Sequence, residues 1–301
     1  MARTGLVGRT YAHRVPPGLL PSPRATLARA VRGRVAGSDF EQAHAAIWHT
    51  PGERWFTERD AIWRVHADTS MFIGGIRALL LQSMHPVAML GVSEHSGFRG
   101  DPWGRLQRTS TYLATTTYGA VADAERSIAI VRAIHRRVKG TTATGEPYRA
   151  DDPHLLLWVH VAEIDSFLVT YQAFGGARLS PAEEDEYVRQ TGLVAQKLGV
   201  IDPPATRGEL DAVLADFRPE LFRSEQAQEA ADLLLRDPPL PAAAKIGYAA
   251  LAAGAISTLP PWVRSELRLP TLPVADRLVA RPLARSAVSA IRWALAGEPD
   301  M

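Results

Sequence analysis

Apolar residues recur every three or four positions along most of the chain, a spacing that places them on one face of a helix. No segment alternates apolar and polar residues between turn dipeptides, which is the pattern of a half-buried strand. A short helix is expected after Pro86 and an interruption near Gly119. The main helices are predicted over residues 39–48, 54–66, 69–84, 102–139, 153–174 and 181–198. We therefore expect an all-α fold.

Local signals support two of these helix boundaries. The sequence Ser180-Pro181-Ala182-Glu183 has the spacing of a capping box, in which the first side chain accepts from the fourth amide. The pair Gly175-Gly176 supplies a stop for the helix over 153–174. Frequent prolines after residue 202 divide the last third of the chain into shorter elements.

The length of 301 residues is sufficient for one large domain with a buried core and a pocket. The 46% of hydrophobic residues excludes disorder as the dominant state. The longest apolar stretch, residues 246–259, is shorter than the roughly 20 residues that a spanning helix needs. We expect a buried or interfacial helix there, with contact to a membrane surface as the less favoured alternative.

The chain contains no cysteine. This excludes disulfides, Cys-ligated zinc, iron–sulfur clusters, thiolate-ligated haem and covalent c-type haem. Any metal or cofactor must therefore be held by histidine, carboxylate or hydroxyl groups.

Charge is nearly balanced, because the net charge of +2 is too small to indicate a nucleic-acid partner. Residues 1–38 nevertheless contain seven arginines and no acidic residue, which predicts a basic N-terminal arm ahead of a single helical domain over residues 39–301. Arginine and proline interrupt every apolar run in this arm, so it lacks the core of a signal peptide. We expect a cytoplasmic protein.

Four histidines lie beside apolar helical sequence or in the segments that join it. His85 ends the helix over 69–84, where the helix dipole would favour a protonated ring. His95 lies in a segment rich in small polar residues that we expect to be a loop. His135 borders an apolar stripe formed by Ile128, Val131, Ile134 and Val138. That placement suits either a haem ligand or a surface histidine at a helix end.

His160 shares a predicted helix face with Glu163, Ile164 and Phe167 in a strongly apolar helix. Polar side chains in such surroundings require hydrogen-bond partners. A buried structural network and a cluster facing a ligand or a metal both remain open for this face.

Three residues at the start of the helix over 102–139 have the spacing of an anion-binding group. Arg105, Arg108 and Thr109 stand at positions i, i+3 and i+4 and therefore share one helix face. Two guanidinium groups there could hold a carboxylate bidentately. A solvated basic stripe is the alternative.

These segments, taken in order, resemble the DUF2236 oxygenase-like family, whose members include the latex clearing protein and the ER-bound oxygenase of mycophenolic acid biosynthesis. The resemblance covers about residues 55 to 270 and is specific as an ordered set, although each piece alone is weak. The segments that carry it are Arg77 to Gln82, His85-Pro86, Gly91 to Ser96, Asp101 to Thr109, Tyr148 to Pro153 and Trp158-Val159-His160.

The resemblance implies a globin-like helical core, with additional peripheral helices, that holds b-type haem. In the latex clearing protein an Arg-x-x-His segment carries the iron ligand, and Arg132-Ala133-Ile134-His135 matches that segment. His135 is therefore expected to bind the iron, with Arg132 in the same cofactor-binding segment and His160 as the alternative ligand.

The resemblance also assigns roles to the residues around the haem. Arg105 is expected at a haem propionate, and Arg108 with Thr109 at the catalytic side. Arg108 stands where the rubber-oxygenase branch has lysine, a change that keeps the charge but alters its shape. His85 and His95 would line the pocket.

We predict from this a haem-b oxidoreductase that activates O₂ against an apolar small molecule. A non-catalytic haem- or lipid-binding protein is one alternative. The other is a non-haem metal enzyme with two histidines and one carboxylate. Its ligands would be drawn from His85, His95 and His160 with Glu94, Glu163 or Asp165.

Overall fold

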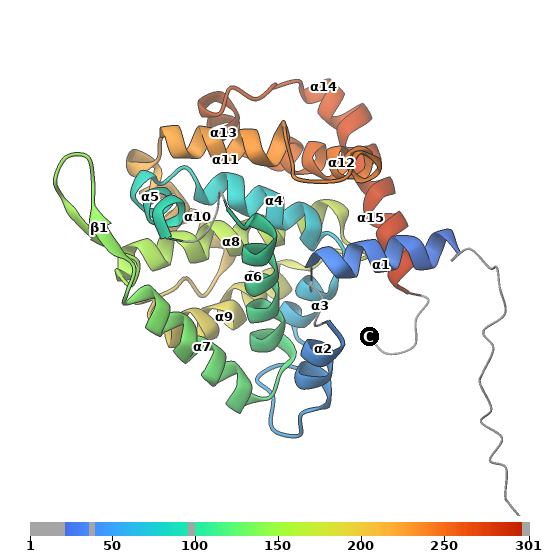
Figure 1. The fold of residues 1–301 in the computed structure, drawn as a ribbon, viewed down its shortest axis with the longest axis horizontal. Coiled ribbons are helices and arrows are strands. Elements are labelled where there is room, and N and C mark those ends of the chain that lie inside the picture. The colour runs from blue at the N-terminus through green and yellow to red at the C-terminus, as the bar shows by residue number, and fades with distance from the viewer. Residues whose placement is uncertain (1–21, 36–39, 96–99, 297–301) are drawn as a thin grey trace, which may run out of the picture.

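The structure, a computed structural model, describes residues 22–35, 40–95 and 100–296. Helices dominate it, as Figure 1 shows, which confirms the all-α prediction. The first half contains α1 (Pro23–Val35), α2 (Phe40–His49), α3 (Ala61–Ala67), α4 (Met71–Gln82), α5 (Pro86–His95), α6 (Pro102–Tyr118), α7 (Val121–His135), β1 (Lys139–Thr141) and β2 (Pro147–Arg149). The second half contains α8 (Pro153–Phe174), α9 (Pro181–Leu198), α10 (Arg207–Asp216), η1 (Arg218–Glu220), α11 (Glu225–Leu235), α12 (Ala242–Thr258), α13 (Pro261–Glu266), α14 (Pro273–Ala275), η2 (Asp276–Ala280) and α15 (Arg281–Leu295).

The core is organised around α4 and α8, which pack against each other more extensively than any other pair of described elements. Gly74 makes this close approach possible, because a Cβ there would lie 2.8 Å from side-chain atoms of both Phe167 and Thr170 on α8. Helix α12 packs on the other side of α4 and carries α15 in turn, while α9 packs against α3, α7 and α8. The buried aromatic side chain of Trp158 lies in this core. The sequence thus places its most apolar helices at the centre.

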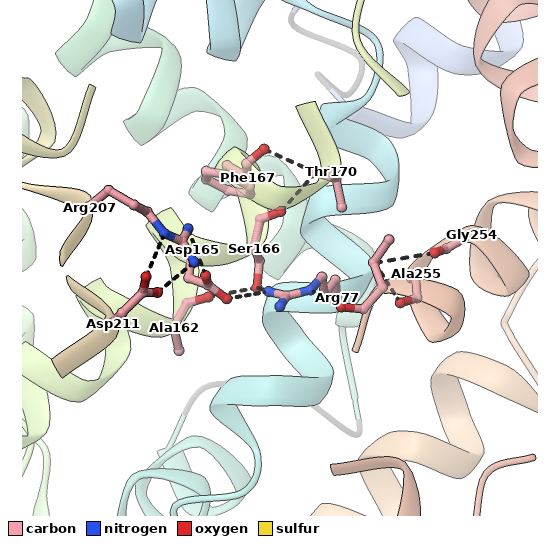
Figure 2. A network of polar contacts seen from close by, with 11 residues as sticks. Arg77, Ala162, Asp165, Ser166, Phe167, Thr170, Arg207, Asp211, Gly254 and Ala255 are labelled. Atoms are coloured by element: carbon pink, nitrogen blue, oxygen red, sulfur yellow. Dashed lines mark hydrogen bonds and ion pairs between the residues drawn. The ribbon is translucent and has the colours of Figure 1, made fainter. Parts of the chain in front are cut away.

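A buried ion pair joins the two central helices. Arg77 of α4 lies 2.8 Å from Asp165 of α8, and the two side chains are 3% and 6% exposed. Arg77 also donates to the Ser166 hydroxyl at 2.7 Å and to the Thr258 carbonyl at 3.2 Å, which connects α12 to the pair. Arg207 approaches the other oxygen of Asp165 at 3.1 Å from the start of α10, as Figure 2 shows. One carboxylate therefore holds together elements from four parts of the chain.

The predicted helix over 54–66 is wrong in its first half, because α3 begins only at Ala61. A turn precedes it, in which the amide and hydroxyl of Thr57 both donate to the Asp60 carboxylate, at 2.6 and 2.8 Å. Arg54 meanwhile donates to carbonyls at the end of α2, including that of Trp48 at 3.1 Å. Local side-chain hydrogen bonds have competed with helix formation here.

The helix predicted to reach Lys139 instead ends at His135, and a small antiparallel hairpin follows. Each strand has three residues, with Gly140 paired to Tyr148. A Cβ at Gly140 would lie 2.6 Å from the Tyr148 hydroxyl oxygen, so a side chain at 140 would collide with the tyrosine ring. Gly145, at φ 87°, makes the turn. Strands this short show no readable alternation in the sequence.

Two further segments differ from the sequence interpretation. Helix α5 continues to His95, so the first part of the expected loop over 91–98 is helical, whereas residues 96–98 lie outside the described part. Within the basic arm, α1 packs against α15 and α6, and Ala28 is buried. Residues 1–21 and 36–38 of that arm lie outside the described part, and the domain boundary at residue 38 stays a prediction.

The apolar stretch over 246–259 forms most of α12. Its second half is buried, with Ala255 fully inaccessible, whereas Ile246 near its start is exposed. Among the helices in the described ranges, none combines the length and the apolar character that crossing a bilayer requires.

Replacing Asp165 with Asn should lower the free energy of unfolding by about 3–5 kcal/mol, because Arg77 would remain buried without its compensating charge. Denaturant unfolding followed by circular dichroism measures this. Glu125→Gln is the control, since its 2.9 Å contact with Lys197 joins two partly exposed side chains and is worth at most about 1 kcal/mol. Equal losses in the two variants would contradict the central role of the buried pair.

Candidate functional site

Helices α6, α7 and α8 carry most of the residues that the sequence singled out. Arg105 lies in the first turn of α6, His135 is the last residue of α7, and His160 lies in the second turn of α8. Helix α7 packs against α6 on one side and α9 on the other. Helices α6 and α7 are therefore direct neighbours, and α8 is connected to α7 through α9, which packs against both.

His135 is half-buried at the end of α7. Its Nδ1 atom is buried and has no hydrogen-bond partner within the described ranges. Burial lowers the pKa of the ring, and the charge of Asp151 offsets part of this effect. The ring is therefore neutral near pH 7, the protonation state in which imidazole binds a metal. Ile134, which the pattern placed on the apolar stripe, is 52% exposed, so that stripe is only partly buried.

His160 is the second histidine with an unsatisfied nitrogen. Its Nε2 atom is buried with no partner among the residues that the structure describes. Burial lowers the pKa of this ring to about 4, so it too is neutral at physiological pH. On the same helix Asp165 and Ser166 do have partners within the described chain, so the two alternatives left open by the sequence apply to different parts of α8. A buried nitrogen without a hydrogen bond is costly, which favours a ligand-facing position.

Glu163 lies one turn beyond His160 on α8. Burial raises the pKa of its carboxyl to about 7, so the group can be protonated at neutral pH. Tyr112 of α6 has a buried hydroxyl with no partner within the described chain. Burial and, secondarily, the charge of Glu163 raise the tyrosine pKa above its ordinary value. The electrostatic coupling of Tyr112 to Glu163 indicates that α6 and α8 face each other here.

Tyr112 was missed by the sequence interpretation, although a signal existed. It stands seven residues after Arg105, which puts both on nearly the same stripe of α6 two turns apart. Arg105 is half-buried, and desolvation lowers its pKa, with a smaller contribution from the positive charge of Arg108. A desolvated guanidinium next to a second cation is a favourable site for an anionic group.

The predicted clamp of Arg105, Arg108 and Thr109 does not converge on one partner. The Arg108 side chain is 64% exposed and lies 3.3 Å from Asp101, the N-cap residue of α6. Thr109 is also exposed. These two therefore face solvent while Arg105 turns inward, and their catalytic roles stay predictions.

Arg132, the other member of the matched Arg-x-x-His segment, is exposed on α7. It donates to the Lys197 carbonyl at 3.5 Å, near the end of α9. Its guanidinium therefore contacts the neighbouring helix, and its role in binding a cofactor stays a prediction.

His85 and His95 occupy opposite ends of α5. His85 is buried, and its Nδ1 accepts a 3.4 Å hydrogen bond from the amide of Ala88. Burial is the largest influence on its pKa and lowers it, so the expected preference for a protonated ring is wrong. His95 is exposed, 3.8 Å from Glu94. The assignment of both residues to the pocket lining stays a prediction.

The structure brings together a different set of potential metal ligands from the one that the sequence suggested. Asp165 is engaged by Arg77 and Arg207, and Glu94 accepts a 2.5 Å hydrogen bond from Tyr148. One group in the described part of the chain has the composition of two histidines and one carboxylate, and it joins His85 to two residues that the sequence did not suggest. These are His154 and Glu220.

Comparison with known proteins identifies a family. The catalytic-domain family described as "ER-bound oxygenase mpaB/B'/Rubber oxygenase" matches residues 63–293, from α3 to α15. This range contains all the histidines and arginines of the candidate site and extends beyond the segments that first carried the resemblance. No curated protein and no solved structure gives a significant match. The chain therefore belongs to the mpaB and rubber oxygenase catalytic-domain family, which is a family of oxygenases.

Proposed function

We propose that this protein is a haem-b-dependent oxygenase that uses O₂ to oxidise an apolar small molecule. The observation that carries the proposal is that His135 and His160, within the oxygenase-family region, each have a buried ring nitrogen with no hydrogen-bond partner among the described residues. A structural histidine in a core ordinarily satisfies its nitrogens. A ligand that binds imidazole would satisfy these two nitrogens.

The donor set fits haem. His135 would hold the iron, with His160 as the alternative, since each offers a neutral imidazole from a helix and the chain has no cysteine to compete. Bound haem would supply the iron at which O₂ is activated. Arg105 is proposed to hold a propionate group, because a guanidinium matches a carboxylate bidentately, and Arg132 stays a proposed member of the cofactor-binding segment.

Glu163 and Tyr112 are suited to hold protons inside the site. A carboxyl with a pKa of about 7 can both take and give a proton at neutral pH, which is the range in which general acid–base catalysis is efficient. The Tyr112 hydroxyl stays protonated and can donate a hydrogen bond inside the site. Glu163 and Tyr112 thus add to the proposed site two residues that the family resemblance did not single out.

Arg108 and Thr109 are proposed to act at the solvent side of α6, where a substrate would enter. Their exposure gives them access to an incoming molecule before it reaches the buried histidines. An apolar substrate is proposed because the family description names a rubber oxygenase, and rubber is an apolar polymer. The cytoplasmic location expected from the sequence stays a prediction.

A non-catalytic haem- or lipid-binding role is the second candidate, and O₂ consumption separates it from the first. A non-haem metal enzyme is a third candidate, favoured only by the juxtaposition of His85, His154 and Glu220. These three residues differ from His135 of α7 and His160 of α8, the proposed haem ligands. A visible absorption spectrum therefore distinguishes a haem site from a non-haem metal site.

The purified protein should show a Soret absorption band, and His135→Ala should abolish it or shift it strongly, because the iron would lose its protein ligand. His160→Ala should retain the band with smaller changes. Visible absorption of both variants, reconstituted with haem in parallel, makes the comparison. Loss of the band in His160→Ala with an unchanged band in His135→Ala would transfer the ligand assignment to His160.

Arg105→Ala should weaken haem binding by a factor of about 10 to 150, the equivalent of the roughly 1.5–3 kcal/mol that a charge-assisted hydrogen bond contributes. Haem titration of the haem-free variant measures the dissociation constant. The matched control is Arg126→Ala, an exposed arginine of α7 paired with Asp123, which should leave haem affinity unchanged.

Thr109→Ala should leave haem bound and lower the turnover number, provided that the hydroxyl acts on the substrate side. Steady-state O₂ consumption measures the turnover, and the Soret absorbance of the same samples reports haem content. Unchanged turnover in Thr109→Ala would remove this residue from the catalytic group.

Glu163→Gln should change the dependence of stability on pH. The folded protein keeps the Glu163 proton up to a pKa of about 7, above the ordinary value of 4.5, so the wild-type free energy of unfolding falls as pH rises between these values and the loss is complete above them. The variant lacks this loss and should be more stable than wild type at pH 8 by up to about 3 kcal/mol, but not at pH 4. Denaturant unfolding of the cofactor-free proteins at both pH values measures the difference. Parallel stability curves would contradict the raised pKa.

A further inference from the structure

Outside the proposed haem site, three potential metal ligands meet where α5 begins, α8 begins and η1 ends. They are His85, His154 and Glu220. One ligand atom from each lies within 4.8 Å of the others. His154 and Glu220 were not singled out in the sequence, because 66 residues separate them.

The distances between these atoms suit a tetrahedral ion. His85 Nε2 lies 3.4 Å from a Glu220 oxygen, and His154 Nε2 lies 2.9 Å from the same oxygen. Two ligands placed about 2.1 Å from a zinc ion at the tetrahedral angle are about 3.4 Å apart. Small side-chain rotations would therefore admit an ion among the three atoms.

His85 is the strongest evidence that the group is directed at a ligand. The residue is 4% exposed, and its buried Nε2 faces the Glu220 carboxylate at 3.4 Å without the geometry of a hydrogen bond. Its ring is enclosed by those of Trp158 and Phe217, at centroid distances of 6.2 and 6.3 Å. A ring fixed in this way presents Nε2 to Glu220 without losing further conformational freedom on binding.

The other two ligands leave one side of the site open. His154 and Glu220 are 54% and 43% exposed, so a fourth coordination position would be filled by water. The Ala88 amide donates to His85 Nδ1 at 3.4 Å, and binding an ion at Nε2 would move the ring proton to Nδ1 and give up that bond. The bond is longer than a typical N–H hydrogen bond, so its loss would reduce the affinity without preventing binding.

We propose that His85, His154 and Glu220 form a binding site for one divalent transition-metal ion of the zinc type. Bound there, the ion links the start of α5 to the start of α8 and to η1. Both histidines are neutral ligands and the carboxylate supplies one negative charge, a set that suits Zn²⁺ better than Ca²⁺ or Mg²⁺.

The experiment is equilibrium dialysis of the full chain, carrying whatever haem it binds, against ZnCl₂ after treatment with a chelator. Elemental analysis then gives zinc per chain. We expect one zinc ion in the wild type, and an affinity at least about tenfold lower in His154→Ala and Glu220→Gln. His49→Ala is the matched control, since it removes another exposed histidine, and it should bind zinc as the wild type does. The two test variants remove exposed side chains, so circular dichroism should show them folded.

Equal zinc binding by all four proteins, or no zinc retained by the wild type, would overturn the proposal. A crystal of the zinc-loaded protein should show anomalous scattering at the zinc edge among the three side chains, and a peak elsewhere would also overturn it. The Soret spectra of these variants report haem separately, because neither His135 nor His160 is changed. Failure of the zinc site and failure of the haem proposal are thus independent results.

Discussion

The architecture depends on one buried charge. Asp165 lies in the middle of the strongly apolar helix α8, and the free-energy cost of burying its charge is offset because Arg77 and Arg207 each approach one of its oxygens. The partners come from α4 and α10, and the Thr258 carbonyl brings α12 to Arg77. Hydrophobic packing would allow α4 and α8 to slide along each other, whereas a paired carboxylate fixes one register. The register between α4 and α8 in turn determines where the helices around the candidate site lie.

Buried polar groups lie in two different environments on helix α8. At Asp165 and Ser166 every charge or hydroxyl is matched by a neighbour, which is typical of a structural network. At His160 and Glu163, about one turn earlier, a ring nitrogen has no partner in the described part of the chain, and burial shifts both pKa values towards the neutral forms. This contrast within α8 separates the part that holds the fold from the part that faces a ligand.

The sequence was informative where one strong local signal dominated. The capping box at Ser180 and the Gly175 stop set the ends of α9 and α8 correctly, since each acts through the backbone nearby. It was uninformative where the outcome depended on distant residues. Nothing near His85 indicates that Glu220 will approach it, and the helical spacing of Arg105 and Arg108 does not show that Asp101 holds Arg108 in solvent. Family resemblance, rather than periodicity, identified the oxygenase region.

The unpartnered atoms also have a thermodynamic consequence. Each buried polar group left without a hydrogen bond costs about 1–3 kcal/mol, and His135, His160 and Tyr112 together represent a sizeable share of the margin that keeps a domain folded. A molecule that satisfies them binds only the native state and so shifts the folding equilibrium by mass action. Cells short of that molecule would then hold a larger unfolded fraction of this chain, exposed to proteases. Its abundance would follow the supply of its ligand even at a constant rate of synthesis.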